Sequence, residues 1–245
     1  MDYGKYKLSW KEVFVGILMW TVISAVLAYF FYKSVAAFVI LFMGFPIFLI
    51  RVKKRLKDKR KWKMTLEFKE MVRFLSSNLQ AGQSVENAFY GVYSDMRSMF
   101  GNKSEMTAEC GIIVRGLQNN VVIENLLRSL AQRSDIDEIY EFVEVFSTAK
   151  RAGGNLREII YDTTDAIDSK IEIKREFRVL IASGKTEQRI MCFIPFGIIM
   201  YISLTSPGYF DILYHNLTGI MIMTGSLAVY LGAFIWGERI LQIQV

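Results

Sequence analysis

Residues 13–32 read VFVGILMWTVISAVLAYFFY, 20 residues without a charged side chain. A helix rises 1.5 Å per residue, so a helix of this length crosses the roughly 30 Å hydrocarbon core of a bilayer. The stretch lacks the small-residue cleavage site of a signal peptide, and it is longer and more aromatic at its end than such peptides are. It therefore predicts a transmembrane helix that stays in the protein.

Three further apolar runs extend this pattern along the chain. Only Lys33 separates the first run from a second uncharged run over residues 34–50, so we expect a tight helical hairpin. Residues 190–206 and 217–236 form a second pair of apolar runs. The sequence thus predicts an all-α membrane protein with four transmembrane helices. Its expected parts are an N-terminal hairpin over 1–52, a helical-bundle domain over 53–189 and a C-terminal hairpin over 190–245.

The charges beside these runs predict the orientation of the chain. Residues 51–63 hold nine Lys or Arg and one Asp, a local charge of +8, and residues 2–11 hold three lysines. The segment 206–216 has no Lys or Arg. Because Lys and Arg resist translocation, we expect a multi-pass protein of the cytoplasmic (inner) membrane. Both termini and residues 53–189 then lie in the cytoplasm.

The basic segment after the second run, called the collar below, has three interpretations. Attraction to anionic lipid headgroups accounts for it without another partner. Nucleic-acid binding is disfavoured, because Trp62 is the one aromatic residue among the basic ones and the segment is held at the bilayer. Docking to an acidic partner protein is left open. The collar consists of Arg51, Lys53, Lys54, Arg55, Lys57, Lys59 and Arg60.

The central region contains no proline and has the periodicity of about six amphipathic helices. Gly82 is expected to form the turn after the first of these helices, and Ser84 is a candidate N-cap for a helix over 85–100. Four apolar residues of the first helix recur at i, i+4, i+7 and i+11, which places them on one stripe. These residues are Phe68, Val72, Leu75 and Leu79.

Cap and turn residues delimit the other helices of this region. Gly153 and Gly154 predict a left-handed turn, which glycine adopts at little cost. Asn155 opens a final helix without a stop signal before the third apolar run, so this helix could reach about 50 residues, or roughly 75 Å. The earlier helices are expected from Ser104 to about Gln118, over 121–133, and over 135–151 with Ser134 as N-cap and a core face of Ile136, Ile139, Tyr140, Val143 and Phe146.

The chain contains no pattern that predicts catalysis or a bound cofactor or metal. Residues 184–186 read Gly-Lys-Thr, as in a phosphate-binding loop, but the first glycine of that motif would fall at Val179 in a segment that reads as helix. One histidine, His215, and two cysteines provide no metal cluster. Apolar runs without charges weigh against a transporter. We therefore predict a protein that is not an enzyme.

Acidic side chains form rows on two of the expected helices. Asp162, Asp165 and Asp168 lie three residues apart, but one helix cannot converge three such carboxylates on an ion, so they predict a solvated surface. The helix over 135–151 carries acidic residues, including Glu138, opposite its apolar side. A charged face of this kind is usually solvated, and that alternative is left open, but the absence of basic residues on it favours a basic partner. We therefore take three of its residues as a hypothetical docking face, namely Asp137, Glu141 and Glu144.

Residues 142–196, FVEVFSTAKRAGGNLREIIYDTTDAIDSKIEIKREFRVLIASGKTEQRIMCFIPF, resemble the type II secretion system F domain. They are especially similar to the platform proteins of tight-adherence (Tad) type IV pilus systems. The likeness rests on the Ala-Gly-Gly-Asn-Leu-Arg-Glu turn over 152–158, on Ile194-Pro195 in the third apolar run, and on the Leu-Gln-Ala-Gly-Gln-Ser turn over 79–84. It covers about residues 66–235.

The resemblance implies a non-enzymatic inner-membrane platform that assembles pilin or pseudopilin subunits and contacts a cytoplasmic hexameric secretion ATPase. Classical members carry two cytoplasmic domains and three spans. One domain and four spans favour the Tad branch, and they imply a homologous second platform protein or self-association. Membrane lipids complete the expected partners, and no nucleic acid or cofactor is expected. The alternatives are a membrane-anchored adaptor or sensor unrelated to fibre assembly and, less favoured, a transporter subunit.

Overall fold

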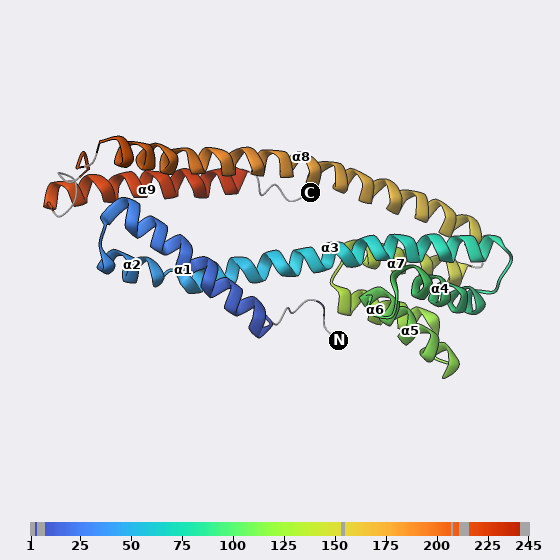
Figure 1. Cartoon of the computed structure of the whole chain (residues 1–245). Coiled ribbons are helices and arrows are strands. Elements are labelled where there is room, and N and C mark those ends of the chain that lie inside the picture. Colours follow the sequence, from blue (N-terminus) through green and yellow to red (C-terminus); the bar gives the residue numbers. More distant parts are fainter. Residues whose placement is uncertain (1–2, 4–7, 153–154, 207, 211–215, 241–245) are drawn as a thin grey trace. The chain divides into compact units, whose positions relative to one another are not determined.

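The structure is a computed structural model that describes residue 3 and residues 8–152, 155–206, 208–210 and 216–240. Every regular element in these residues is an α-helix, which confirms the all-α prediction (Figure 1). In chain order the helices are α1 (Trp10–Tyr32), α2 (Val35–Phe42), α3 (Phe45–Gln80), α4 (Val85–Phe100), α5 (Glu105–Gln118), α6 (Ile123–Ser134), α7 (Asp137–Ala152), α8 (Leu156–Thr205) and α9 (Leu217–Ile240).

The described residues form two compact units. The helical bundle comprises Tyr3 and the described residues between Lys53 and Ile173, and the membrane unit comprises Leu8–Val52 and the described residues from Lys174 to Ile240. The bundle therefore ends earlier than the boundary at 189 that the apolar pattern suggests. Tyr3 belongs to the bundle, although the sequence places it in the N-terminal hairpin segment.

Several described helices are long and apolar enough to cross a bilayer. They are α1, α8 and, in α9, Thr218–Ile240. A further candidate is the pair of α2 and α3, which is bent by 45° at the break between them. These helices indicate a membrane-spanning protein with three spans, or four if the bent pair forms one span.

The first hairpin turns within two residues, as the sequence predicts. Lys33 ends α1 in the left-handed conformation, with φ at 44°, and Ser34 precedes α2 in an extended conformation. Helices α1 and α2 then pack against each other. In the second pair, α8 and α9 run side by side (Figure 1). Here Gln188 Nε2 donates to the Phe234 carbonyl at 3.2 Å, and the Tyr230 hydroxyl donates to the Cys192 carbonyl at 3.1 Å.

The predicted second span over 34–50 is not one straight helix, because α2 ends at Phe42 and α3 begins at Phe45. Pro46 explains the break: it lacks an N–H, and its ring clashes with the carbonyl four residues earlier, that of Phe42. The Trp20 indole of α1 donates to that carbonyl at 3.3 Å. A Cβ on Gly44 would lie 2.9 Å from Trp20 Cζ2, so the missing side chain lets the indole approach the bend.

Two helices connect an apolar segment to the bundle without interruption. Helix α3 has 36 residues and contains the whole collar, so no loop separates the second apolar run from the bundle. Helix α8 has 50 residues, the length expected from the absence of a stop signal, and it continues through Pro195. Asn155 precedes it and donates through Nδ2 to Glu158 Oε2 at 3.0 Å.

The core of the bundle forms where the apolar stripes of α3 to α8 meet. The predicted stripe on α3 is confirmed, since Phe68, Val72, Leu75 and Leu79 are all buried. The ring of Phe68 meets Phe142 of α7 edge-on, with centroids 5.5 Å apart. Each such side chain contributes about 1.5–3 kcal/mol through removal from water. The packing therefore fixes which faces of α3 and α7 point inward.

Most expected boundaries in the bundle agree with the structure, and two details are wrong. Ser134 is not the N-cap of α7: it is the buried last residue of α6, and its hydroxyl donates to the Ala131 carbonyl at 3.0 Å. Asp135 makes the turn instead, with φ at 54°. Tyr140 is 41% exposed and does not belong to the core face of α7, where Phe142 is fully buried.

The turn predicted at Gly82 is confirmed, since this residue has φ of 88°. A left-handed conformation costs a non-glycine residue roughly 1–2 kcal/mol, which accounts for glycine here. Ser84 then caps α4, its Oγ accepting from Asn87 N at 3.3 Å. The predicted turn at Gly153 and Gly154 lies outside the described residues.

Candidate functional site

The predicted docking face on α7 is exposed, but it does not consist of free carboxylates alone. Asp137, Glu141 and Glu144 all lie on the surface. Lys170 of α8 binds Glu141, with Nζ 2.7 Å from Oε1, and this hydrogen bond raises the pKa of Lys170. Glu138, which the sequence pattern includes in the acidic face, is buried. Within the described chain, Asp137 and Glu144 thus remain as the members without an ion pair.

The collar divides into residues that pack with the bundle and residues that face solvent. Arg60 Nε lies 2.6 Å from Glu105 Oε1, and Lys57 lies 3.8 Å from Asp135. Arg51, in the membrane unit, lies 3.7 Å from Glu238. Among the residues with described positions, three exposed collar side chains have no ion pair, namely Lys53, Lys54 and Lys59.

The turn between α6 and α7 is held by a lysine that follows the collar. Lys61 Nζ donates to the Asp135 carbonyl and lies 2.6 Å from its Oδ2. The hydrogen bond from Lys61 lowers the pKa of Asp135. Asp tolerates the left-handed conformation better than most residues, because its short side chain finds local polar partners. The basic segment thus stabilises the turn that ends α6.

The row of aspartates on α8 is not one solvated surface, contrary to the prediction from sequence. Asp168 Oδ2 accepts a hydrogen bond from Arg73 Nε of α3 at 2.6 Å and lies 2.6 Å from Arg73 Nη2, and Lys69 Nζ lies 3.8 Å from Oδ1. The hydrogen bond to Asp168 raises the pKa of Arg73. Asp162 and Asp165 are exposed, as predicted. Asp168 therefore contributes to the packing of α3 against α8.

A buried polar cluster around Glu109 was not predicted from the sequence. Glu109 of α5 is 0% exposed, accepts from the Tyr3 hydroxyl at 2.9 Å, and accepts from Arg133 Nε at 3.4 Å. The Tyr3 amide also donates to the Arg133 carbonyl at 2.9 Å, and Arg60 lies 5.0 Å above the Tyr3 ring. Burial, followed by the bond to Glu109, raises the pKa of Tyr3. The sequence did contain a signal for this cluster: Glu109 lies one helical turn from both Met106 and Ile113, so it falls on the apolar stripe that faces the core.

A second buried carboxylate joins α3 to the start of α5. Glu67 Oε2 accepts from Ser104 Oγ at 2.9 Å and from the Met106 amide at 3.4 Å. Its Oε1 has no hydrogen bond in the described structure, and Lys63 Nζ lies 3.7 Å from it. At that distance Lys63 acts through charge rather than through a hydrogen bond. A carboxylate at a helix N-terminus also interacts favourably with the helix dipole.

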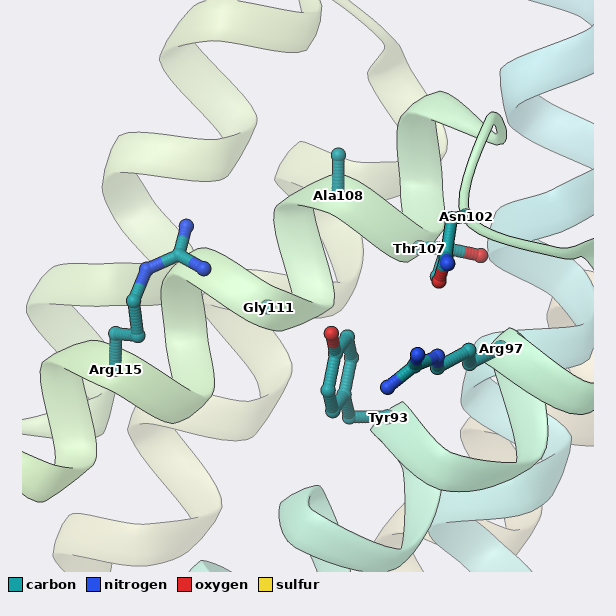
Figure 2. Close-up of a pocket in the computed structure, with 7 residues that line it drawn as sticks. All are labelled: Tyr93, Arg97, Asn102, Thr107, Ala108, Gly111 and Arg115. Atoms are coloured by element: carbon teal, nitrogen blue, oxygen red, sulfur yellow. The ribbon is translucent and has the colours of Figure 1, made fainter.

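A cavity of about 340 Å³ opens between α4 and α5. Figure 2 shows the Tyr93 ring below Gly111, with the guanidinium groups of Arg97 and Arg115 on either side of it in this view. Gly111 has a steric role here, because a Cβ at this position would lie 3.2 Å from Tyr93 Cε2. Sequence periodicity placed no site here.

The remaining residues that could bind a metal or react do not form a cluster among the described residues. No group of three or more His, Cys, Asp or Glu side chains in the described residues could hold a metal ion. Cys110 is a buried free thiol, and burial raises its pKa to about 12. Residues 184–186, the partial phosphate-loop match, lie inside helix α8, as the sequence pattern predicts. No matching protein-family model, curated protein or solved structure was found for the chain.

Proposed function

We propose that this protein is a non-enzymatic platform of a Tad-like type IV pilus or type II secretion machine in the cytoplasmic (inner) membrane. It couples a cytoplasmic hexameric ATPase to the insertion of pilin or pseudopilin subunits. The observation that carries the proposal is the continuity of α3 and α8, each of which extends from an apolar segment into the bundle. A continuous helix can transmit a displacement that a flexible linker would absorb. The resemblance over residues 66–235 supplies the identity of the machine.

The proposal includes four spans, with both termini and the bundle in the cytoplasm. The bent pair of α2 and α3 then counts as one span, and the collar lies on the cytoplasmic side. A cysteine introduced at Lys33 should react with an impermeant reagent added from outside, whereas one at Gln132 should not. External labelling at Gln132 would overturn the topology and with it the proposed contact with a cytoplasmic motor.

The partners follow from the exposed charges. Lys53, Lys54 and Lys59 can meet anionic lipid headgroups, each contributing about 1 kcal/mol near such a surface. Asp137 and Glu144 can meet a basic surface of the ATPase. Exposed ion pairs contribute about 0–1 kcal/mol each and are screened by salt, which suits a contact that breaks in every motor cycle. A second copy or a homologous platform protein completes the assembly.

The decisive experiment measures binding of the ATPase to the full chain in lipid nanodiscs at low salt. Reversal of Asp137 and Glu144 to lysine should weaken binding and fibre assembly, while insertion into the membrane stays unchanged. Reversal of Asp162 and Asp165 to lysine is the matched control, because it makes the same change of charge at exposed positions on α8.

Equal binding by both double variants and the wild type would remove the docking face from the proposal. Failure of the wild type to bind any secretion ATPase, together with a partner that binds only under a particular stimulus, would favour the adaptor or sensor. Nucleotide hydrolysis by the purified chain that disappears on Lys185→Ala would contradict the non-enzymatic role.

A further inference from the structure

The cavity between α4 and α5 differs from the other charged sites of the bundle in having cations without carboxylates. Its lining includes the guanidinium groups of Arg97 and Arg115 and no acidic side chain. Three other arginines of the bundle form ion pairs with carboxylates: Arg60 with Glu105, Arg73 with Asp168 and Arg133 with Glu109. In the described structure neither cavity arginine has an ion pair.

A second cavity, of about 330 Å³, provides an internal comparison. It lies between α3 and α8, and its lining contains Arg73 together with Asp165 and Asp168. The charge of Arg73 is already neutralised by its hydrogen bond and ion pair with Asp168. An anion entering that cavity would have to displace a carboxylate of the protein. The cavity between α4 and α5 presents no such competitor.

Polar groups other than the arginines also converge on the cavity. Asn102 contributes a side-chain amide, and Tyr93 contributes a hydroxyl beside the ring that packs under Gly111 (Figure 2). The Thr107 hydroxyl is already committed, since it donates to the Met96 carbonyl at 3.3 Å, so its oxygen is not a free donor. Thr107 lies in the first turn of α5, and Asn102 lies in the loop before that helix.

The two arginines reach the cavity from different helices and at different points along α5. Arg97 comes from α4, whose residue Met96 contacts Thr107, so Arg97 belongs to the Thr107 end of the cavity. The Arg115 side chain runs back along α5, since its Nη1 would lie 3.6 Å from a Cβ on Gly111. Gly111 follows Thr107 by four residues, or about 6 Å along the helix axis, so two linked anionic groups can each meet one arginine. The volume lies at the lower end of the roughly 300–1,000 Å³ typical of small-molecule pockets.

We propose that this cavity binds a soluble diphosphate-type anion, with one phosphoryl group at Arg97 and the other at Arg115. The planar guanidinium group binds phosphate oxygens through two parallel hydrogen bonds, which lysine cannot do. The proposal is independent of the platform role and would hold for an adaptor or a sensor as well. In the proposal, Arg97 and Arg115 bind a ligand, whereas the described arginines that pair with carboxylates hold the helices of the bundle together.

The test uses the full chain in detergent, with inorganic pyrophosphate as the probe and calorimetric titration at constant ionic strength. We expect saturable binding that Arg97→Gln and Arg115→Gln each weaken at least tenfold. Arg97→Lys and Arg115→Lys should retain part of the affinity, because charge remains while the paired hydrogen bonds are lost. Arg128→Gln is the matched control, an exposed arginine on α6 outside the cavity, and it should bind as the wild type does.

Other probes separate a built site from general attraction to a basic protein. Inorganic phosphate, which offers one phosphoryl group, should bind at least tenfold more weakly than pyrophosphate. ADP carries the same diphosphate group and should depend on the same two arginines. Equal binding of sulfate, phosphate and pyrophosphate, or equal losses in the Arg128 and cavity variants, would overturn the proposal. Absence of saturable binding to a wild-type chain with intact thermal unfolding would overturn it too.

Discussion

Replacing Arg133 by methionine tests whether the buried cluster around Glu109 stabilises the bundle. Arg133 is the cationic partner of Glu109, whose side chain is 0% exposed. Methionine keeps an unbranched apolar side chain of similar reach but removes the guanidinium group. The variant therefore leaves a carboxylate inside the protein with the Tyr3 hydroxyl as its one other described hydrogen-bond partner.

The burial of this ion pair sets the size of the effect. Removing one partner of a buried ion pair costs about 3–5 kcal/mol, because the other charge stays buried without compensation. The Arg133 side chain is itself 24% exposed, so water can reach the site and we expect the lower end, about 3 kcal/mol. Since 1.4 kcal/mol is a factor of ten, the opening equilibrium of α5 and α6 should rise roughly 100-fold.

Hydrogen exchange followed by mass spectrometry on the full chain measures this quantity for the helices concerned. Peptides from α5 and α6 should lose protection in Arg133→Met, whereas peptides from α9 should not change. The double variant Glu109→Gln with Arg133→Met should regain most of the protection, because it removes the unpaired charge as well. Arg128→Met on α6 is the matched control and should stay within about 0.5 kcal/mol of the wild type.

Two results would contradict a stabilising role of this ion pair: hydrogen exchange in Arg133→Met that matches the control, or a double variant that exchanges as fast as the single one. In the first case the Arg133–Glu109 ion pair would contribute no more to the stability of the bundle than an exposed charge does. In the second case the loss comes from packing of the arginine stem rather than from an unpaired Glu109.

Three further outcomes follow from local geometry. Gly82→Ala should lower stability by about 1 kcal/mol, measured by thermal unfolding, because φ is 88° while no atom lies within 4 Å of the new Cβ; Gly82→Asn should cost less. Asp135→Asn should cost up to about 1 kcal/mol at pH 7, because Asp135 has a lowered pKa in the folded state and its ionised form is stabilised by Lys61. The contribution of the Asp135 carboxylate to stability is present at pH values above the pKa of about 3.9 that it has in the unfolded chain. It is lost as the pH falls through the lower pKa of the folded state, so the melting curves of Asp135→Asn and the wild type should converge in acid. Gly44→Val should reduce the yield of folded protein from membranes, because the new Cβ would lie 2.9 Å from the Trp20 ring; an unchanged yield in size-exclusion chromatography would contradict the close packing at the bend.

The acidic helix faces show how far periodicity predicts a candidate site. Spacing along one helix correctly placed Asp137, Glu141 and Glu144 on the surface. It could not reveal that Glu141 meets Lys170, since the two residues are 29 positions apart and lie on different helices. It also grouped Glu138 with the surface, although that residue is buried. The helical period predicts which residues lie on one side of a helix, but the packing of neighbouring helices determines whether that side is exposed or buried.

The second span shows that a local signal can be present and still be overlooked. The run over residues 34–50 contains no charge, and hydropathy alone makes it one span. Pro46 was visible in the sequence, and its missing N–H predicts a break close to where α2 ends. The bend of 45°, and the Trp20 indole that satisfies the Phe42 carbonyl there, depend on the packing of α1 and were visible only in three dimensions.

The helical class, the apolar segments and most helix ends of the bundle could be predicted from the sequence, because these features depend on neighbours within a few residues. A run without charges meets the energetic requirement of the hydrocarbon core, and residues such as Gly82 and Ser84 end or begin a helix through their own backbone and side-chain preferences. Which charges pair between different helices became visible only in the tertiary structure. Tyr3 meets Glu109 across 106 positions, and Arg73 meets Asp168 across 95. No local preference encodes such a meeting, because it exists only after the apolar stripes have packed and brought distant helices within hydrogen-bond distance.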